Sequence, residues 1–101
     1  MDEIGPIDIA ERKRLTADFR RDLGSALLVS AFWTAEAVSG SDPQAQSRLD
    51  TAAATLESSK ASCYFDGALA GVTYSVRCVA TDSAGGKHAA AALLAGVKLQ
   101  G

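Results

Sequence analysis

The residues that could carry chemistry are few and scattered along the chain. His88 is the single histidine among 101 residues, and it stands beside a predicted hairpin loop. Catalysis needs groups of matched pKa that converge on one point. One histidine can be paired on paper with a serine and an aspartate in almost any sequence, and no pattern here places a nucleophile on a strained turn. We therefore expect His88 to be a surface residue and the protein not to be an enzyme.

The acidic residues and the cysteines follow no catalytic or metal-binding pattern either. Four acids lie within residues 1–12, where the geometry is not fixed, and the aspartates further along do not have the spacing of a calcium loop. The spacing of Cys63 and Cys78 matches no zinc or redox motif. We expect both cysteines to be thiols that fill small buried sites, and we expect no metal or cofactor.

A glycine-rich stretch and a basic stretch have ordinary explanations. "SAGGKH" (83–88) lacks the G-x-x-x-x-G-K-[ST] order of a phosphate loop. "ERKR" (11–14) suits a solvated strand entry or a salt bridge to a partner better than nucleic-acid contact. The net charge of −2 also argues against nucleic acid as the main partner, because phosphate binding usually needs a basic surface.

Length and composition limit the elements that must position any site. A chain of 101 residues forms one domain at most, and 48% apolar residues favour folding over disorder. Aromatic residues are few, so we expect a thin, two-layer core. The longest apolar run, "ALLVSAFW" (26–33), is far shorter than the roughly 20 residues of a membrane span. The N-terminus lacks the pattern of a signal peptide, so we expect synthesis in a cytoplasm and no membrane association.

The first third of the chain predicts an arm and two strands. Residues 1–12 predict a short N-terminal arm, either extended or loosely docked, ahead of a domain at 13–101. Within 14–24, apolar residues at every second position predict a strand that ends near Asp22–Gly24, with a helix as the alternative. Residues 25–37 are apolar on both faces, which suits a central strand or a strand whose outer face meets a partner.

The middle of the chain is less regular. Residues 38–47 are dense in Ser, Gly, Asp and Pro and predict a loop. Residues 48–61 favour a helix by propensity, whereas their Thr and Ser content favours a short strand near 53–58. Residues 61–67 alternate between apolar and polar side chains and predict a strand with one buried face, to which Phe65 belongs.

The last third of the chain gives the clearest prediction. Residues 74–81 alternate strictly and predict a strand, followed by a hairpin loop in which Gly85 and Gly86 can adopt positive φ. Residues 89–99 predict the last strand, although their four consecutive alanines also suit a helix. The chain thus has about six short strands separated by turns, which is typical of an all-β antiparallel β-sandwich.

The tyrosine at the start of the alternating run has a specific role in one class of sandwich. Alternation places Tyr74 on the same face as Val76 and Cys78. The pattern Leu69-x-Gly71-x-x-Tyr74-x-Val76 resembles the L-x-P/A-G-x-x-Y-x-V run of fibronectin type III and related domains. The resemblance implies an immunoglobulin-like fold, in which this tyrosine folds inward and its hydroxyl bonds a backbone group a few residues upstream. An exposed, ligand-contacting Tyr74 is the alternative.

Over residues 13–97 the chain also resembles a family of small tailed-bacteriophage proteins with an immunoglobulin-like fold, the fiber–tail adaptor proteins. Trp33 matches the family's tryptophan on an early strand and would be the large central core residue. The family's later glycine-rich segment is matched by Gly67, Gly71, Tyr74 and Val76. The chain departs from the pattern at Asp66, where the family has the first glycine of a pair, and at Lys87, which replaces an arginine.

This resemblance implies a non-enzymatic structural protein of a virion. Its expected partners are other tail, neck or fiber proteins, with the chain repeated in a symmetric ring or as a homo-oligomer. Segments 26–33 and 89–97 are the candidate packing surfaces, with ordinary core as the alternative. Two other functions remain open: a capsid decoration or cement protein, and a cellular immunoglobulin-like binding module with Tyr64 as its outward aromatic residue.

Overall fold

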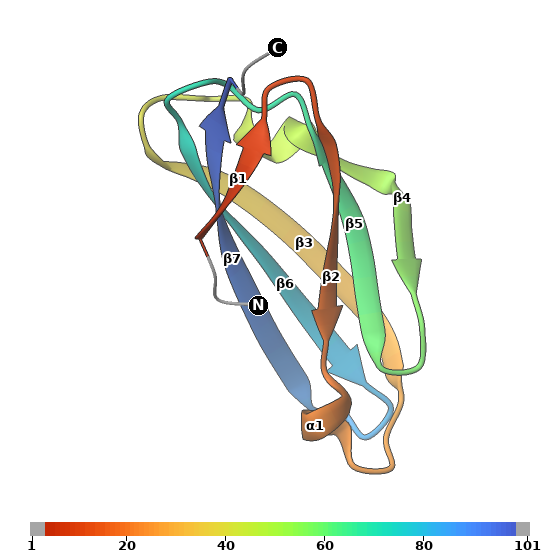
Figure 1. The fold of residues 1–101 in the computed structure, drawn as a ribbon. Coiled ribbons are helices and arrows are strands. Elements are labelled where there is room, and N and C mark those ends of the chain that lie inside the picture. Colours follow the sequence, from red (N-terminus) through yellow and green to blue (C-terminus); the bar gives the residue numbers. More distant parts are fainter. Residues whose placement is uncertain (1–3, 99–101) are drawn as a thin grey trace.

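The computed structural model describes residues 4–98 (Figure 1). In chain order, the elements are β1 (Ile4–Asp8), β2 (Arg12–Asp18), the short helix α1 (Arg20–Leu23), β3 (Leu28–Ser39), the 3₁₀ turn η1 (Ala45–Arg48), β4 (Leu49–Leu56), β5 (Lys60–Asp66), β6 (Thr73–Asp82) and β7 (Lys87–Val97). Most of the described chain is therefore β-strand, with little helix. It forms an elongated body of 45 × 23 × 23 Å.

The strands form two sheets that pack face to face. The larger sheet has the strand order β1-β7-β6-β3 and the smaller sheet the order β2-β5-β4 (Figure 1). Neighbouring strands are antiparallel except β1 and β7, which are parallel. The prediction of an all-β sandwich is confirmed, and consecutive strands β2 and β3 lie in different sheets.

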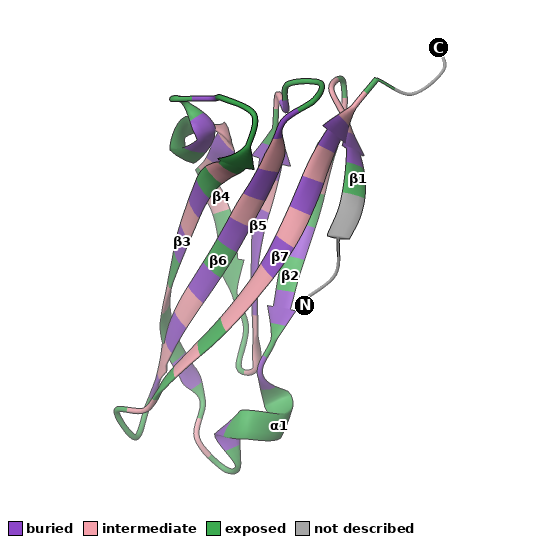
Figure 2. Cartoon of the chain, turned by 90° about the vertical axis from the view of Figure 1, so that its left-hand side faces the viewer, coloured by how far each residue is buried: buried purple, intermediate pink, exposed green. Residues whose placement is uncertain are grey.

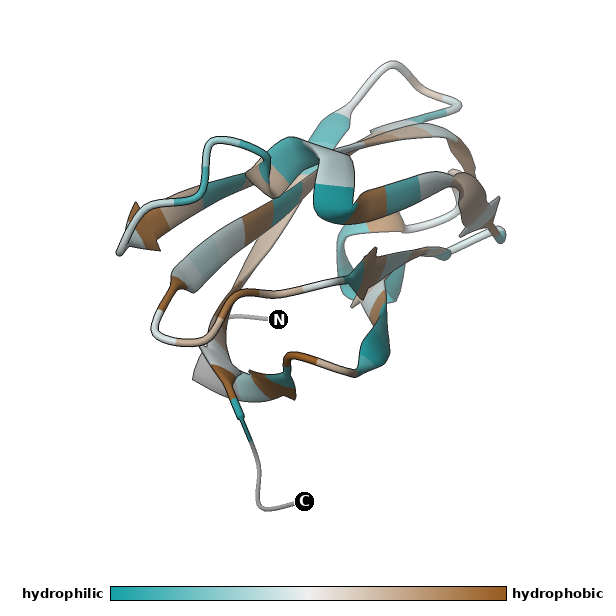
Figure 3. Ribbon diagram, turned by 90° about the horizontal axis from the view of Figure 1, so that it is seen from above, coloured by the Kyte–Doolittle hydropathy of each residue, from teal (hydrophilic) through white to brown (hydrophobic). Residues whose placement is uncertain are grey.

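The core lies between the sheets and follows the alternation seen in the sequence. Along β6, the inward side chains have 0% exposure, and these are Tyr74, Val76, Cys78 and Ala80. Figure 2 shows this alternation of buried and less buried residues along β6, and Figure 3 shows the matching alternation of hydropathy along the strands. The strand predicted at 74–81 is therefore confirmed, with one further residue at each end.

Large aromatic side chains fill the middle of the core. Trp33 of β3 is 3% exposed and Phe65 of β5 is 0% exposed. The rings of Phe65 and Tyr74 lie 4.9 Å apart between centroids at an angle of 58°, a tilted arrangement that aromatic pairs favour. Phe65 comes from the smaller sheet and Tyr74 from the larger, so this pair joins the two layers.

The N-terminal segment differs from the expected arm. Residues 1–3 of that segment lie outside the described residues, and Ile4–Asp8 pair in parallel with Leu93–Val97 of β7 as the edge strand of the larger sheet. Ile7 has 0% exposure. The sandwich therefore begins before residue 13, because the apolar side chain of Ile7 completes the core beside β7.

The segment 14–24 is a strand, as predicted, but it ends earlier than expected. The carboxylate of Asp18 accepts a hydrogen bond from the backbone N–H of Arg20 at 2.9 Å, which turns the chain into α1. The Phe19 N–H donates to the Ser59 carbonyl, 2.9 Å away. Both patterns weighed for this segment are thus present: period two up to Phe19, and one short helical turn after it.

The remaining elements follow the predictions with shifted boundaries. The uncertain segment 48–61 contains strand β4, which begins at Leu49 and has a register irregularity between Asp50 and Thr55. In the β6–β7 hairpin, Gly85 has φ +86°, whereas Gly86 does not adopt positive φ. Gly86 is required for space, because a Cβ there would approach the Asp82 carboxylate to 2.7 Å.

Candidate functional site

The Tyr74 side chain joins two loops at one end of the sandwich. Its hydroxyl accepts a hydrogen bond from the Leu69 N–H at 2.9 Å and donates one to Asp42 Oδ2 at 2.6 Å. Leu69 lies in the loop before β6, and Asp42 lies in the loop after β3. Burial, followed by the hydrogen bond to Asp42, raises the pKa of Tyr74. The phenol is therefore a fixed cross-link between loops.

Asp42 is the centre of this network. It is 7% exposed and, besides Tyr74, accepts hydrogen bonds from the Arg48 guanidinium and from the Gln44 N–H. The hydrogen bond from Arg48, supported by those from Tyr74 and Gln44, lowers the pKa of Asp42 to about 2 against the opposing effect of burial. The carboxylate is thus ionised and fully partnered, so it has no capacity left to act as an acid or a base.

The loop before β6 uses Leu69 differently from the predicted apolar anchor. The Leu69 side chain is 41% exposed, and only its backbone N–H takes part in the network. Ala68 and Val72, which are 3% and 6% exposed, provide the buried apolar side chains of this loop. The chain turns between them, so the intervening side chain of Leu69 faces outward.

Two glycines allow this loop to lie against β7. Gly71 has φ +81°, and its N–H donates to the Gly96 carbonyl at 3.0 Å. The Gly96 N–H donates to the Val72 carbonyl at 2.8 Å. A Cβ at Gly96 would overlap the Leu69 carbonyl oxygen, whereas one at Gly71 would meet no atom within 4 Å. Gly71 is therefore needed for its backbone conformation and Gly96 for its lack of a side chain.

A second buried aspartate lies at the opposite end of β6. Asp82 is 7% exposed and accepts hydrogen bonds from His88 Nε2 at 2.8 Å and from the N–H groups of Ala84 and Gly86. The His88 ring also lies 6.1 Å from the Phe19 ring. The expectation of a surface His88 is therefore corrected: its side chain is 19% exposed, because the hairpin folds it against Asp82.

The two cysteines are buried free thiols, as predicted. Burial raises the pKa of Cys63, and burial together with the nearby Cys63 raises that of Cys78 to about 11. A thiol with a raised pKa is a poor nucleophile at neutral pH, because the thiolate is the reactive form. Cys63 and Cys78 therefore act as small apolar core residues.

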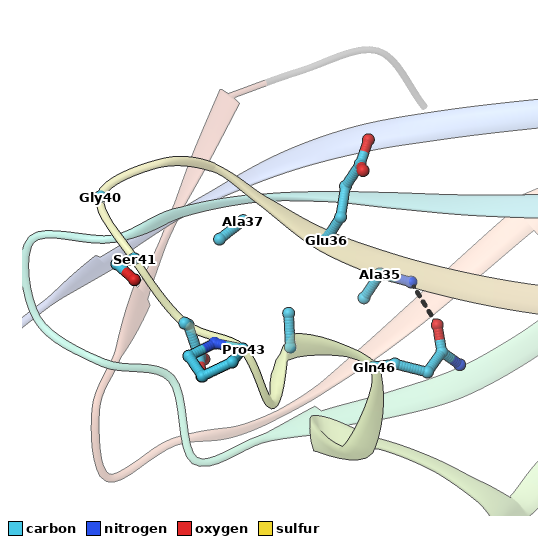
Figure 4. Close-up of a pocket in the computed structure, with 9 residues that line it drawn as sticks. Ala35, Glu36, Ala37, Gly40, Ser41, Pro43 and Gln46 are labelled. Carbon is cyan, nitrogen blue, oxygen red and sulfur yellow. Dashed lines mark hydrogen bonds between the residues drawn. The ribbon is translucent and has the colours of Figure 1, made fainter.

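A shallow hollow of about 410 Å³ lies between β3 and the following loop (Figure 4). Its lining consists mainly of small or neutral residues, including Ala35, Ala37, Ser41 and Pro43. The side chain of Gln46 closes one side, where it accepts from the Ala35 N–H at 2.9 Å and donates to the Trp33 carbonyl at 3.2 Å. Gln46 thus covers part of the β3 edge, an edge that would otherwise pair with another strand.

The hollow does not assemble a catalytic group. Its two carboxylates are those of Glu36 and Asp42, and Asp42 is already bound to Tyr74 and Arg48. In residues 4–98, no group of three or more His, Cys, Asp or Glu side chains is placed to hold a metal ion. Every buried side-chain nitrogen and oxygen in that range has a hydrogen-bond partner. The buried polar side chains of residues 4–98 are therefore all engaged in hydrogen bonds within the protein.

The outside of the sandwich is different, because large apolar side chains are exposed there. Phe32 is 68% exposed, and Leu27 and Val29 of the same segment are 56% and 57% exposed. Segment 26–33 therefore contributes Leu28 and Trp33 to the core and exposes other large apolar side chains, and its role as a packing surface stays a prediction. The exposed residues are the strongest candidates for function in the part of the chain that the structure describes.

Sequence reasoning missed the polar partners of the buried residues. It identified Tyr74 but not Asp42, Arg48 or Gln46, which come from a stretch predicted only as a loop. The spacing of Asp42 and Gln44 is that of an Asx turn and would have suggested a structured loop. No pattern in the sequence pairs Asp42 with a residue 32 positions away.

Comparison of the chain with protein-family models, with curated proteins and with solved structures found no match. Among residues 4–98, no helix has the length and hydrophobicity to cross a membrane. The interpretation of function therefore depends on the residues and geometry described above.

Proposed function

We propose that the protein is a non-enzymatic structural module with an immunoglobulin-like fold, and that it acts as an adaptor in the tail or neck of a bacteriophage virion. It would be made in the host cytoplasm and dock fibers or neighbouring tail proteins. The observation that carries this proposal is the contrast between a fully partnered interior and exposed apolar side chains such as Phe32. Such a molecule acts by binding, since burial of exposed apolar surface drives association.

The strand order supports the immunoglobulin-like part of the proposal. In immunoglobulin constant-type domains, strands C, F and G share one sheet and strands A, B, E and D the other. Here β3, β6 and β7 share one sheet and β2, β5 and β4 the other, whereas the first strand, β1, lies beside β7 instead of joining the sheet of β2. The hydroxyl of Tyr74, bonded to the backbone five residues upstream, has the geometry of the tyrosine corner of these domains.

The virion role is supported by the sequence resemblance over residues 13–97. Two residues that match the family pattern, Trp33 and Tyr74, lie in the core of the sandwich. Two others, Gly67 and Gly71, both adopt positive φ in the loop before β6. Burial of the two aromatic residues and positive φ at the two glycines are consistent with the residue types that the adaptor pattern has at these positions. The proposed partners are other virion proteins, with the chain repeated around a symmetric ring.

A reconstruction of the particle whose genome encodes this chain tests the proposal. The expected result is a location in the tail or neck with about a dozen copies or fewer per ring. Hundreds of copies on the shell would show a capsid decoration protein instead, and absence from purified particles would refute a virion role.

The alternative of a cellular glycan-binding module is less well supported by the geometry. Sugar platforms use exposed aromatic faces, but the Arg12 guanidinium carbon lies 4.2 Å from the centroid of the Tyr64 ring and covers one face. Tyr64 is also only partly exposed. Binding to a glycan array that is lost in Tyr64→Ala would favour this alternative over the virion adaptor.

A further inference from the structure

The two segments predicted as packing surfaces contribute to one face of the molecule, on either side of β6. In the larger sheet, Phe32 of β3 pairs with Val79 of β6, which pairs with Ala89 of β7. The next two rows along the strands continue the same face. We call the nine outward residues of these three rows the outer face: Phe32, Val79, Ala89, Thr34, Arg77, Ala91, Glu36, Ser75 and Leu93.

The outer face is suited to close contact with another surface. Five of its nine residues are apolar, and its alanines and Ser75 are small, so another backbone can approach closely. Two shallow hollows of about 240 and 160 Å³ lie on it, one beside Glu36 and Arg77 and the other beside Ala91 and Leu93. Phe32, which is 68% exposed, has little contact within the described chain to remove its ring from water.

The charges on this side of the sheet are divided along the strand direction. Glu36 lies in the row towards the end of β3, whereas Arg77 lies one row away and Lys87 lies at the opposite end of the face, where it pairs with Thr81. All three side chains are exposed, and none forms an ion pair with another described residue. Glu36 therefore gives one end of the face an acidic group and Lys87 gives the opposite end a basic group, whereas Arg77 lies between them, one row from Glu36.

We infer that the outer face packs against the outer face of a second copy of this chain, with the strands of the two copies running in opposite directions. A twofold axis that lies in the interface and crosses the strands places the acidic end of each copy over the basic end of the other. Glu36 of one copy then faces Lys87 of the second, and the same contact occurs twice. A parallel arrangement would place like charges together.

The available area fits a weak, transient dimer. A strand of ten residues is about 33 Å long, and the three neighbouring strands β3, β6 and β7 span about 14 Å, so their outer side offers roughly 460 Å² per copy. Two copies would bury about 900 Å², which lies below the standard size of specific interfaces and in the range of weak, transient contacts. The predicted dimer is therefore weak and visible at high protein concentration. This inference does not depend on the virion role.

Sedimentation equilibrium of the purified full chain, measured up to about 1 mM at low salt, tests the inference. The wild type is expected to dimerise. Glu36→Arg and Lys87→Glu are each expected to raise the dimer dissociation constant about tenfold or more, because each variant replaces two attractive contacts with two repulsive ones. The double variant is expected to return to within about threefold of the wild type.

Matched controls separate this face from the rest of the surface. Glu57→Arg, in the turn after β4, and Arg21→Glu, in α1, reverse the same charges away from the outer face and are expected to leave dimerisation unchanged. The inference is refuted if the wild type is monomeric throughout, if the controls weaken the dimer as much as the outer-face variants, or if the double variant fails to recover. A monomer that is nevertheless found in virus particles would refute the dimer and leave the proposed function intact.

Discussion

Near each end of β6 a buried aspartate accepts several hydrogen bonds, but the partners of the two aspartates lie at different distances along the sequence. At each end a buried aspartate accepts the N–H of the residue two positions ahead, Gln44 for Asp42 and Ala84 for Asp82. The Asp42 carboxylate also accepts a hydrogen bond from Tyr74, 32 positions away. The most distant hydrogen-bond partner of the Asp82 carboxylate is His88, six positions away. The first aspartate joins segments that are distant in the sequence, and the second shapes a single hairpin.

This difference separates global from local stability. Breaking long-range contacts lets the loops after β3 and before β6 separate, so the whole sandwich should lose stability. Breaking contacts inside a hairpin should mainly open that hairpin, since proteins also open in local units. The predictions below test this comparison, beginning with the largest expected effect.

Asp42→Ala is expected to lower the melting temperature by more than about 10 °C, because it leaves the Arg48 charge and the Tyr74 hydroxyl without their buried partner. Thermal unfolding followed by circular dichroism measures this shift. Asp50→Ala is the control, since it removes an exposed ion pair with Arg12 and should change the melting temperature by only a few degrees. Equal effects of the two variants would contradict the central role of Asp42.

Gly96→Ala should also destabilise the Tyr74 end, by about 1–3 kcal/mol in urea unfolding, because the new Cβ meets the Leu69 backbone. Gly71→Ala should cost about 1 kcal/mol, since it strains the backbone without a clash. A larger cost at Gly71 than at Gly96 would show that the loop before β6 does not lie against β7 as described.

Tyr74→Phe is expected to reduce the free energy of unfolding by about 1–3 kcal/mol, because it leaves the buried Asp42 and Leu69 groups short of one partner. Urea unfolding monitored by tryptophan fluorescence provides the measurement. Tyr64→Phe is the matched control, and it should change the free energy by less than about 0.5 kcal/mol. No loss of stability in Tyr74→Phe would mean that the hydroxyl network contributes nothing to the fold.

Acid should destabilise the protein through both aspartates. The folded state lowers the pKa of Asp42 to about 2, chiefly through Arg48, and lowers that of Asp82, chiefly through His88. A lowered pKa in the folded state gives stability that is fully present above the unfolded value, near 4, and is lost as the pH falls through the folded value. The free energy of unfolding should therefore decrease as the pH is lowered from 5 to 2.

Asp42→Asn removes the titrating group at one end and should flatten this pH dependence, although the variant is less stable at neutral pH. Asp66→Asn, at an exposed position for which the network predicts no role, should leave the slope unchanged. A pH dependence identical in Asp42→Asn and the wild type would show that Asp42 is not the ionised centre of the network.

His88→Gln should have the smallest effect, about 1 kcal/mol or less on global unfolding, because the hairpin N–H groups still hold Asp82. Amide hydrogen exchange should nevertheless become faster in residues 83–87, while exchange of the β2 and β5 amides stays as in the wild type. Faster exchange throughout both sheets would place His88 in the global network and remove the distinction between the two ends.

The sequence predicted the parts of the fold that depend on short-range alternation. Period-two patterns identified the strands around Tyr74 and Phe65, and glycine identified the hairpin at Gly85. The pairing of β1 with β7 was not predicted, because a parallel edge strand of five residues containing Gly and Pro has no alternation to detect. The end of β2 was misplaced because the turn after it depends on the hydrogen bond from the Arg20 N–H to the Asp18 carboxylate, and apolar periodicity gives no sign of such a bond.

The candidate surfaces were predicted in part. The apolar character of 26–33 and of 89–97 is visible in the sequence, but their position on one face depends on the register of both with β6. The partners of Tyr74 were likewise hidden, since a buried phenol requires a partner but its own sequence neighbourhood does not specify which one.

The central claim is that a closed polar interior fixes the sandwich and leaves the outer face to bind. The amide chemical shifts of the ¹⁵N-labelled chain, followed on dilution from about 1 mM to about 20 μM, test it most directly. We predict concentration-dependent shifts in β3, β6 and β7 around Phe32, Arg77 and Ala91, with constant shifts in β2, β4 and β5. Shifts that are constant everywhere, or that change mainly in the smaller sheet, would contradict the claim.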